Sequence, residues 1–314
     1  MQGKLKPPFF FVNRLVYDKY LLDKARDVGV DVLEGDEVIE IDQMQGRVKT
    51  ASGKTISSKY IVGADGAHSI VRRGLPDSTE NKEQWDENLA IALELKIKYE
   101  ELMHHLDVNS ISEVQKKFSQ PMLFLGVADW GYGWIFPNQD MAVIGICGLQ
   151  SKSHKKIVQK FEKFLEEVGI QDVIEKTSVS GYPLPYGNFI EKPAHNNTLL
   201  VGDAGGFAEP ILGEGIFYAH RTAELAAHAI DVSIREGNCA EGVYLDLIQR
   251  YIVPEMKHAK VLRDLIYSCL DHHIDQPISF FISLFGERLI EIVHGRRRFN
   301  PFQSGEDYYG RIKG

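Results

Sequence analysis

The sequence predicts a mixed α/β protein in which an antiparallel sheet is inserted into a parallel-sheet core and a helical region follows. Three observations support this fold class. A short apolar strand followed by glycines and a helix occurs twice, at Lys59–Gly63 and at Thr198–Gly202. Strand-like segments fill the region between them, and helical periodicity dominates Ala240–Val293. The 314 residues, 44% of them hydrophobic, suffice for about two domains with a sizeable core.

The composition argues against several classes of function. Lys and Arg total 36 and Asp and Glu total 44, so the net charge of −8 disfavours nucleic-acid binding. The cysteines, Cys147, Cys239 and Cys269, form no C-x-x-C, which predicts a reducing, cytoplasmic setting without a zinc site or disulfide framework. We expect no metal site, no signal peptide and no membrane span, since Ile278–Phe285 is too short to cross a bilayer.

The N-terminal part alternates helix and strand. We expect a helix over Tyr17–Val28, ended by Gly29, and then a short strand over Val30–Leu33. A β-meander should follow in three strands: Val38–Ile41, Gly46–Thr50 and Lys54–Ile56. The polar segment Pro76–Asn88 shows no periodicity, and we place a domain crossing there.

The middle of the chain predicts the inserted antiparallel sheet. Its expected strands are Leu89–Lys98, Met122–Val127, Tyr132–Phe136 and Met141–Cys147. An amphipathic helix is expected over His154–Val168, with one apolar side made by Ile157, Val158, Phe161, Phe164 and Leu165. A long helix is expected over Gly215–Arg235.

A first glycine-containing motif follows the strand that ends at Gly63. Asp65 and Gly66 come next, and a helix should begin near Ser69. Glycine lets a ligand approach the backbone, a helix start offers free N–H groups to a phosphate, and Arg72 would add charge-assisted hydrogen bonds. The alternative is a tight turn between strand and helix that binds nothing.

A second motif follows the strand that ends at Gly202. The strand delivers Asp203 to the carboxyl edge of the sheet, where open α/β folds bind ligands. A carboxylate there can accept hydrogen bonds from sugar or ribityl hydroxyls. Gly205 removes a side chain from the approach, Pro210 bends the chain, and Gly213 and Gly215 lead into the long helix, whose start carries partial positive charge.

Together the two motifs resemble those of the FAD-dependent reductases and hydroxylases typified by p-hydroxybenzoate hydroxylase. Gly63–Arg72 resembles the G-A-D-G-x-x-S-x-V-R segment, and Gly202–Ile216 resembles G-D-A-x-x-x-x-P-x-x-G-x-G-I. Upstream, Arg14–Leu21 resembles R-x-x-F-D-x-x-L, with Tyr17 in place of Phe. The resemblance implies a Rossmann-like FAD-binding domain. The residues that it implies for cofactor binding are Arg14, Asp65, Gly66, Gly202, Asp203, Gly205, Pro210, Gly213, Gly215 and Ile216.

A fourth motif is similar to one in geranylgeranyl reductases. Tyr132-Gly-Trp134-Ile-Phe136-Pro137 matches the pattern Y-x-W-x-F-P, whose residues line the cavity for a polyprenyl chain in that family. Asp129 stands where the family often has Pro. By itself the aromatic strand would equally suit the core of a sheet. Beside the flavin motifs, the resemblance implies that Tyr132, Trp134, Phe136 and Pro137 line a substrate cavity.

The family reduces isolated C=C bonds of geranylgeranyl groups on lipids, chlorophyll precursors or diphosphates. The resemblance therefore implies an isoprenoid C=C reductase that uses FAD, with NAD(P)H or ferredoxin as electron donor and a polyprenyl lipid or diphosphate as substrate. Tyr132 is the candidate proton donor, or only a cavity wall. Pro277–Val293 would cover the cavity mouth or contact a membrane surface. Two alternatives stay open: a flavin-dependent monooxygenase, and a non-catalytic domain that binds a lipid or a protein partner.

The family begins with a strand, G-x-G-x-x-G and a helix, and none of the 28 glycines forms that motif. We therefore expect the first βαβ unit to be absent and the chain alone to bind FAD weakly or not at all. The implied segments are 1–75 as a partial FAD-binding domain, 76–185 as the antiparallel-sheet substrate domain, 186–236 as the return of the FAD-binding domain, and 237–314 as a helical region.

Overall fold

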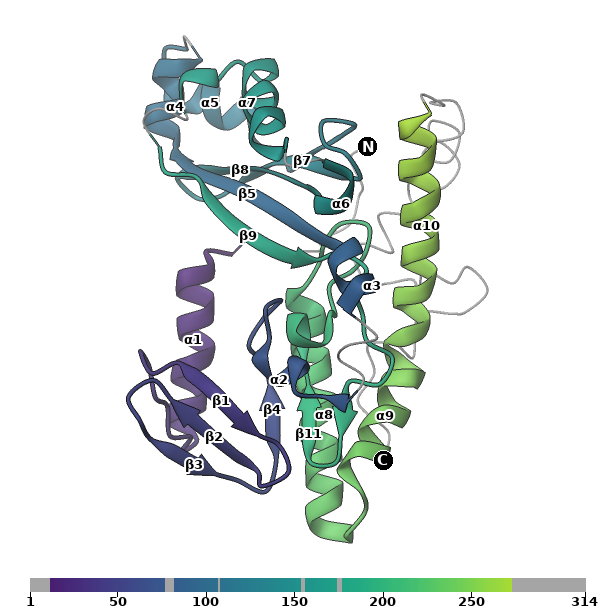
Figure 1. Ribbon diagram of the computed structural model, residues 1–314. Coiled ribbons are helices and arrows are strands. Elements are labelled where there is room, and N and C mark those ends of the chain that lie inside the picture. The colour runs from purple at the N-terminus through teal and green to yellow at the C-terminus, as the bar shows by residue number, and fades with distance from the viewer. Residues whose placement is uncertain (1–11, 77–81, 107, 154–155, 174–176, 273–314) are drawn as a thin grey trace, which may run out of the picture. The chain divides into compact units, whose positions relative to one another are not determined.

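A computed structural model of the chain describes residues 12–76, 82–106, 108–153, 156–173 and 177–272 (Figure 1). The predicted mixed α/β class, with antiparallel sheet and helical C-terminal part, is confirmed. The chain forms two compact units. Unit 1 comprises Met1–Asp36, Ala92–Gly148 and Ser153–Tyr182, and unit 2 comprises Glu37–Ile91, Leu149–Lys152 and Pro183–Gly314. The predicted four functional segments stay a prediction.

A five-stranded sheet, ordered β6-β7-β8-β5-β9, forms the centre of unit 1. Its strands are β5 (Leu89–Lys98), β6 (Met122–Leu125), β7 (Gly131–Pro137), β8 (Met141–Leu149) and β9 (Ser180–Pro185). The pairs β6–β7 and β7–β8 are antiparallel, as expected. In such pairs directly opposed residues share a face, and Leu123, Trp134 and Gly145 are opposed across the three strands.

Helices cover one face of this sheet (Figure 1). They are α4 (Tyr99–His105), α5 (Ile111–Lys117) and α7 (Ile157–Glu167), and a short 3-10 turn, Gln171–Val173, follows them. Phe164 of α7 is buried, and its ring meets that of Phe124 at a centroid distance of 5.0 Å. Val158, which we placed on the buried side of this helix, is 53% exposed, so the packed stripe is narrower than predicted.

The helix α1 (Arg14–Asp27) also belongs to unit 1 and begins earlier than predicted. Asn13 starts it, because its side chain accepts a hydrogen bond from the Leu15 N–H at 3.1 Å. The predicted strand at Val30–Leu33 is wrong. None of the strands in the described residues pairs with it, and the Val30 N–H bonds back to the Ala25 carbonyl at the end of α1.

Unit 2 contains two three-stranded sheets. The meander is confirmed as β1 (Val38–Asp42), β2 (Arg47–Thr50) and β3 (Thr55–Ser57), all antiparallel. The second sheet has the order β10-β11-β4, with bounds Ala194–His195, Thr198–Leu200 and Ile61–Gly63. Pro76–Asn88 is not wholly irregular, because α3 (Lys82–Glu87) forms there and buries Trp85.

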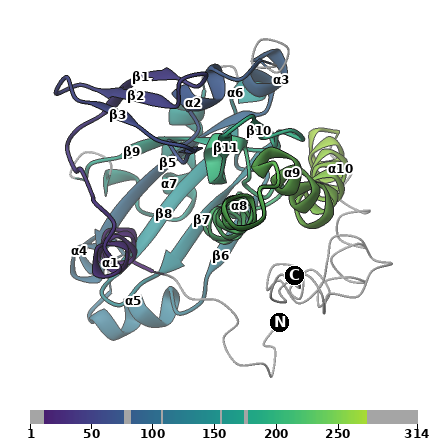
Figure 2. The same ribbon diagram turned by 90° about the horizontal axis from the view of Figure 1, so that it is seen from below.

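The helices α8 (Ile216–Glu236) and α9 (Ala240–Tyr251) lie beside β11, and α10 (Val253–Asp271) packs against α9 (Figures 1 and 2). The shorter elements are α2 (Ile70–Arg73), α3, α6 (Gln150–Ser153) and the 3-10 turn η3 (Gly202–Gly205). Leu199, Leu225 and Ile248 are fully buried in one core cluster of β11, α8 and α9. The Tyr244 hydroxyl in this core donates to the Leu200 carbonyl at 2.7 Å.

The predicted C-terminal helical region is therefore confirmed as far as Asp271. The segment Pro277–Val293, to which we gave a role at a cavity or membrane, lies outside the described residues. Among the residues that the structure describes, no helix is long and apolar enough to span a bilayer.

Candidate functional site

The two predicted motifs follow neighbouring parallel strands of unit 2. Strands β4 and β11 pair in parallel with Gly63 opposite Leu200, so both motif loops leave the same edge of the sheet. Arg72 ties the loops together. Its Nη2 donates to the Ala67 carbonyl at 2.8 Å in the first loop, and its Nη1 donates to the Ala204 carbonyl at 3.2 Å in the second.

The carboxylate of Asp65 shapes the first loop. Its Oδ2 accepts hydrogen bonds from the N–H groups of Ile70 at 2.7 Å and Val71 at 3.3 Å. Ser69 caps the same helix by accepting from the Arg72 N–H at 2.9 Å, which confirms the predicted helix start. Asp65 thus has a structural role that sequence reasoning missed, while its contact with a cofactor stays a prediction.

Arg72 has partners other than the phosphate that we predicted for it. Its guanidinium stacks on the indole of Trp85, 3.4 Å from the ring centroid. Burial lowers the pKa of Arg72 to about 10, although the charge of Asp65 opposes this shift. Sequence reasoning missed Trp85, whose only signal was an aromatic residue in a polar segment. Arg72 therefore serves to hold the two loops and α3 together.

The second loop requires glycine at Gly206, where φ is 76° and a Cβ would lie 2.8 Å from the backbone of Asn188. The loop also brings Asp203 to the start of α8. A Cβ on Gly215, the N-cap of that helix, would lie 3.4 Å from Asp203 Oδ1. The structure therefore brings two predicted cofactor residues together at a helix N-terminus.

Two glutamates that sequence reasoning missed complete this loop. Glu214 Oε1 accepts the Phe217 N–H at 2.9 Å, so a carboxylate already lies at the start of α8. Glu209 is 5% exposed and accepts the N–H groups of Ile211 at 2.7 Å and Leu212 at 2.6 Å. Burial raises the pKa of Glu209 to about 7, against the effect of these two hydrogen bonds. The sequence signal that could have identified Glu209 was a carboxylate within an apolar, Pro-containing turn.

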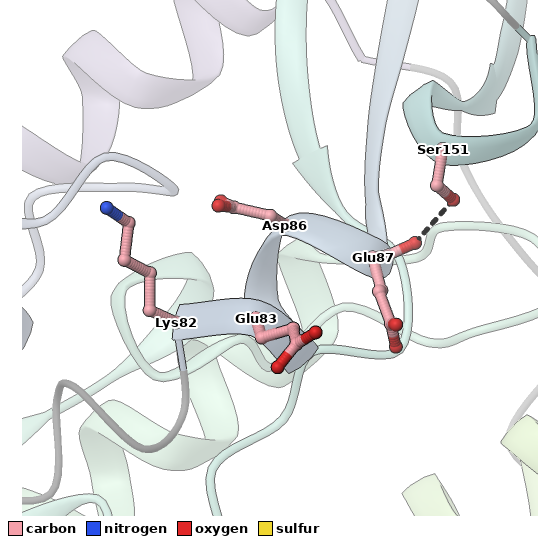
Figure 3. A pocket seen from close by; sticks show the side chains of 5 residues that line it. All are labelled: Lys82, Glu83, Asp86, Glu87 and Ser151. Carbon is pink, nitrogen blue, oxygen red and sulfur yellow. Dashed lines mark hydrogen bonds between the residues drawn. The ribbon is translucent and has the colours of Figure 1, made fainter.

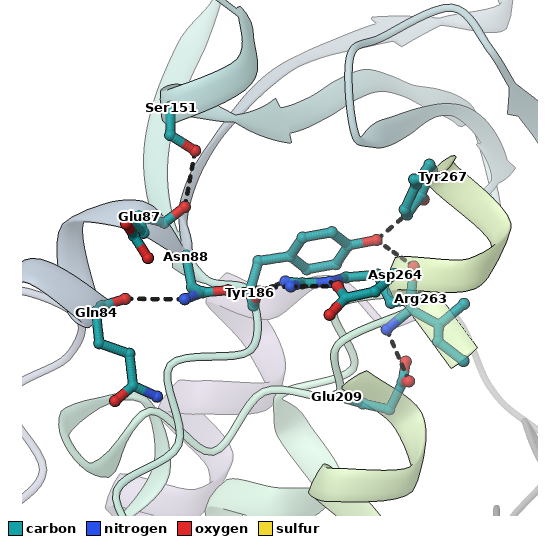
Figure 4. A network of polar contacts seen from close by, with 10 residues as sticks. Gln84, Glu87, Asn88, Ser151, Tyr186, Glu209, Arg263, Asp264 and Tyr267 are labelled. Carbon is teal, nitrogen blue, oxygen red and sulfur yellow. Dashed lines mark hydrogen bonds and ion pairs between the residues drawn. The ribbon is translucent and has the colours of Figure 1, made fainter. Parts of the chain in front are cut away.

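A buried polar network adjoins Glu209 (Figure 4). At its centre lies Arg263 of α10, which is 2% exposed. Its guanidinium donates to the carbonyl of Tyr186, to Asn88 Oδ1 at 3.0 Å and to Asp264 Oδ1 at 2.7 Å. The Tyr186 N–H donates to the Asn88 carbonyl at 3.0 Å, and the Tyr186 hydroxyl lies 3.1 Å from that of Tyr267. These contacts join α10 to the segments just before β5 and just after β9.

The predicted cavity residues form an aromatic ladder on β7 in unit 1. We use this name for Tyr132, Trp134 and Phe136, whose adjacent ring centroids are 5.7 and 6.1 Å apart. Gly145 on β8 makes room for the indole, because a Cβ there would lie 2.2 Å from the Trp134 ring. Tyr132 and Trp134 are buried, which suits a sheet core as well as a cavity wall, and Pro137 ends the strand.

Two further ionisable groups lie on the ladder's face of the sheet. Cys147 packs against Tyr132 and Trp134, and burial raises the pKa of its thiol to about 12. Ala92 of β5 packs against the same cluster, and Glu94, two residues further along the strand, shares its face. Burial raises the pKa of Glu94, against the opposing charge of Lys96. Sequence reasoning missed Glu94.

Two predicted cofactor residues remain to be placed, Arg14 and Ile216. Arg14 belongs to unit 1 and pairs with Asp18, Nε to Oδ1 at 2.9 Å, and its cofactor contact stays a prediction. Ile216 is the first residue of α8. A surface hollow of about 560 Å³ in unit 2 contains none of the predicted residues (Figure 3). It is lined by Lys82, Glu83, Asp86, Glu87 and Ser151. In the described part of the chain no group of His, Cys, Asp and Glu could hold a metal ion.

Comparison with known proteins adds a family and a set of relatives. A family model described as FAD binding domain matches residues 10–230. An uncharacterized protein of Methanosarcina barkeri is 29% identical over 86% of this chain and 63% of its own length. A digeranylgeranylglycerophospholipid reductase of Methanococcus aeolicus is 23% identical over 81% and 64%. Digeranylgeranylglycerophospholipid reductase 3 of Methanosphaera stadtmanae is 26% identical over 85% and 66%.

The chain thus spans 63–66% of the length of these relatives. Among solved structures, a geranylgeranyl bacteriochlorophyll reductase-like protein of Thermoplasma acidophilum matches with a TM-score of 0.64 and 21% identity, over 83% of this chain and 66% of that one. FqzB matches with a TM-score of 0.60 and 16% identity, over 93% and 74%. At these identities the structures show the fold alone. The resemblance to geranylgeranyl reductases is confirmed by the relatives that are named digeranylgeranylglycerophospholipid reductase.

Proposed function

Because this chain belongs to the FAD binding domain family, we propose that it acts in an FAD-dependent reductase that saturates C=C bonds of isoprenoid chains. The observation that carries the substrate class is the aromatic ladder, whose buried rings would line one wall of an apolar cavity for a polyprenyl chain. The names of the relatives from Methanococcus and Methanosphaera support the same class of substrate. A polyprenyl lipid or a polyprenyl diphosphate would suit this surface.

The residues at the β4–β11 edge fit part of FAD. Space is open beside Gly66, where a Cβ would meet no atom within 4 Å, and Asp203 offers a carboxylate at the start of α8. Open space beside a carboxylate suits the ribityl hydroxyls and the flat ring edge of a flavin. A glycine-rich cradle for the pyrophosphate is not among the residues of this sequence, which contains no G-x-G-x-x-G. We therefore propose that this chain alone binds FAD weakly or not at all.

Within the proposed site each residue has a defined task. Asp203 would accept hydrogen bonds from ribityl hydroxyls, and Gly205, Pro210 and Gly213 would let the backbone approach the ring. Gly215 and Ile216 begin α8, whose positive end would favour negative charge on the ring edge. The Glu214 carboxylate at the same helix start weakens that field. Arg14, Asp65, Gly66 and Gly202 would contact the cofactor's diphosphate and ribityl chain.

Bound FAD would supply hydride chemistry, with NAD(P)H or ferredoxin proposed as the source of electrons. Saturating an alkene also requires a proton for the second carbon. Tyr132 and Glu94 both carry a dissociable proton on the face of the aromatic ladder. The raised pKa of Glu94 keeps its carboxyl protonated to higher pH than usual, which favours it as the acid.

The test begins with a titration of the purified chain with FAD. Reduced flavin and a geranylgeranyl lipid are then added without oxygen, and mass spectrometry looks for the gain of two hydrogens per double bond. Trp134→Ala should abolish turnover and leave FAD binding unchanged, whereas Val158→Ala, an exposed apolar site in the same unit, serves as the matched control. Glu94→Gln and Tyr132→Phe separate the two proton sources.

Two other outcomes correspond to the alternatives. A product that gains oxygen in the presence of O₂ would support a flavin-dependent monooxygenase. Lipid binding by the flavin-free chain, without turnover under any condition, would support a non-catalytic lipid-binding domain. Co-sedimentation with lipid vesicles would test the proposed peripheral contact with a membrane.

A further inference from the structure

Glu209 organises the loop that leads into α8. Its carboxylate accepts the amide hydrogens of Ile211 and Leu212, as described above. Its own backbone completes the turn, because its carbonyl accepts the Gly213 N–H at 2.8 Å and its N–H donates to the Glu214 carbonyl at 2.9 Å. Both the side chain and the backbone of Glu209 therefore fix the conformation of residues 210–215.

The opposite side of the loop is held by Tyr186. The Tyr186 hydroxyl donates to the Ile211 carbonyl and lies 3.1 Å from the hydroxyl of Tyr267 on α10. The N–H of Ile211 is thus bonded to Glu209 and its carbonyl to Tyr186. If the hold on its N–H weakened, the loop would be fixed on one side only.

We propose that Glu209 is a positioning residue for residues 210–215. When ionised, its carboxylate accepts the amides of both Ile211 and Leu212, an arrangement that we call the clasp, and when protonated it releases one of the two amides. Protonation converts one carboxylate oxygen from an acceptor into a hydroxyl donor, so only one of the two amides keeps its acceptor. This inference rests on the proposed function, because Pro210, Gly213 and Gly215 of the loop are proposed to meet the flavin. The clasp would therefore set how well the loop fits the cofactor.

Charged and titratable groups face Glu209 from each neighbouring element. Burial is the main cause that raises the pKa of Glu209 to about 7. The charge of Glu214, on the same loop, raises this pKa further, and the charge of Arg263 on α10 lowers it. Tyr186 and Tyr267 complete the surroundings and act as hydrogen-bonding groups. The change between the two states thus falls near neutral pH.

Hydrogen exchange of the whole chain without flavin tests the clasp directly. The exchange of the Ile211 and Leu212 amides is followed by NMR between pH 5.5 and 8.5 and divided by the intrinsic rate at each pH. We expect protection of at least one amide to rise by about tenfold with pH, as one hydrogen bond is gained. Glu209→Gln should show no such rise. Glu214→Gln should keep the rise and shift its midpoint to lower pH.

A second measurement separates this inference from the proposed function. FAD affinity is measured over the same pH range, and we expect it to follow the midpoint of the exchange profile in the natural chain and to be flat in Glu209→Gln. Protection that is independent of pH, or a rise that persists in Glu209→Gln, overturns the clasp even if FAD binds. FAD affinity that stays constant with pH, while the exchange profile changes, overturns the link to the cofactor and leaves the proposed function to the turnover assay.

Discussion

Replacing Arg263 with methionine removes the centre of the polar network and keeps most of the side chain's volume. The guanidinium is 2% exposed and donates to the Tyr186 carbonyl and to Asn88 Oδ1. Methionine cannot donate, so both buried acceptors lose their partner, and each loss costs about 1–3 kcal/mol. The bond to Asp264 adds little, because that carboxylate is 45% exposed. Part of the loss is offset, since the variant no longer buries a charge.

We therefore expect Arg263→Met to lower the free energy of unfolding by about 3 kcal/mol. The matched control is Lys257→Met on the same helix, which removes an exposed cation paired with Glu191 at 2.8 Å. That ion pair is half exposed and should contribute no more than about 1 kcal/mol. Urea unfolding at pH 7, followed by circular dichroism and tryptophan fluorescence, measures both. Equal losses in the two variants would show that the network does not stabilise unit 2.

Three further predictions concern single side chains. Glu209→Gln removes a carboxyl whose pKa burial raises to about 7, well above the ordinary range of a glutamate, so the native state binds its proton more tightly than the unfolded state. The natural chain should therefore lose about 2–3 kcal/mol of stability relative to the variant between pH 5 and pH 8, and parallel urea profiles would contradict this. Gly145→Ala should displace the indole of Trp134 and lower stability by about 1–3 kcal/mol, which near-UV circular dichroism and urea unfolding would detect. Asp203→Ala should weaken FAD binding by about tenfold in a flavin titration, and unchanged affinity would refute its proposed role.

The elements that were predicted correctly carry their signal in local sequence. Leu199–Val201 is an uninterrupted apolar run, typical of a strand buried on both faces, and the strand Thr198–Leu200 pairs in parallel with β4. The helix α8 ends at Gly237, a residue with φ of 74° that suits a helix C-terminus. An apolar strand and a glycine at a helix end are both determined by residues adjacent in the sequence, so they can be predicted without a structure.

The elements that were missed depend on residues far apart in the chain. Val30–Leu33 has the composition of a strand, but a strand also requires a partner, and the pattern contains no information about one. Arg263 meets Asn88 across 175 positions, and no spacing rule connects them. No spacing rule connects Trp85 and Arg72 either, whose stacking holds the short helix α3 against the first loop. Parts of the candidate site that rest on such contacts became visible only in three dimensions.

The hydrogen bond between the Tyr186 N–H and the Asn88 carbonyl has a consequence for how this protein can change. Asn88 and Tyr186 both belong to unit 2 and flank the stretch of chain from β5 to β9, which carries the five-stranded sheet, so the two ends of this stretch are one hydrogen bond apart. An insertion whose ends meet can be lengthened or exchanged without separating the strands that receive it. A different sheet grafted between these two residues would give the chain a new surface, while the parallel pairing of β4 and β11 stays in place.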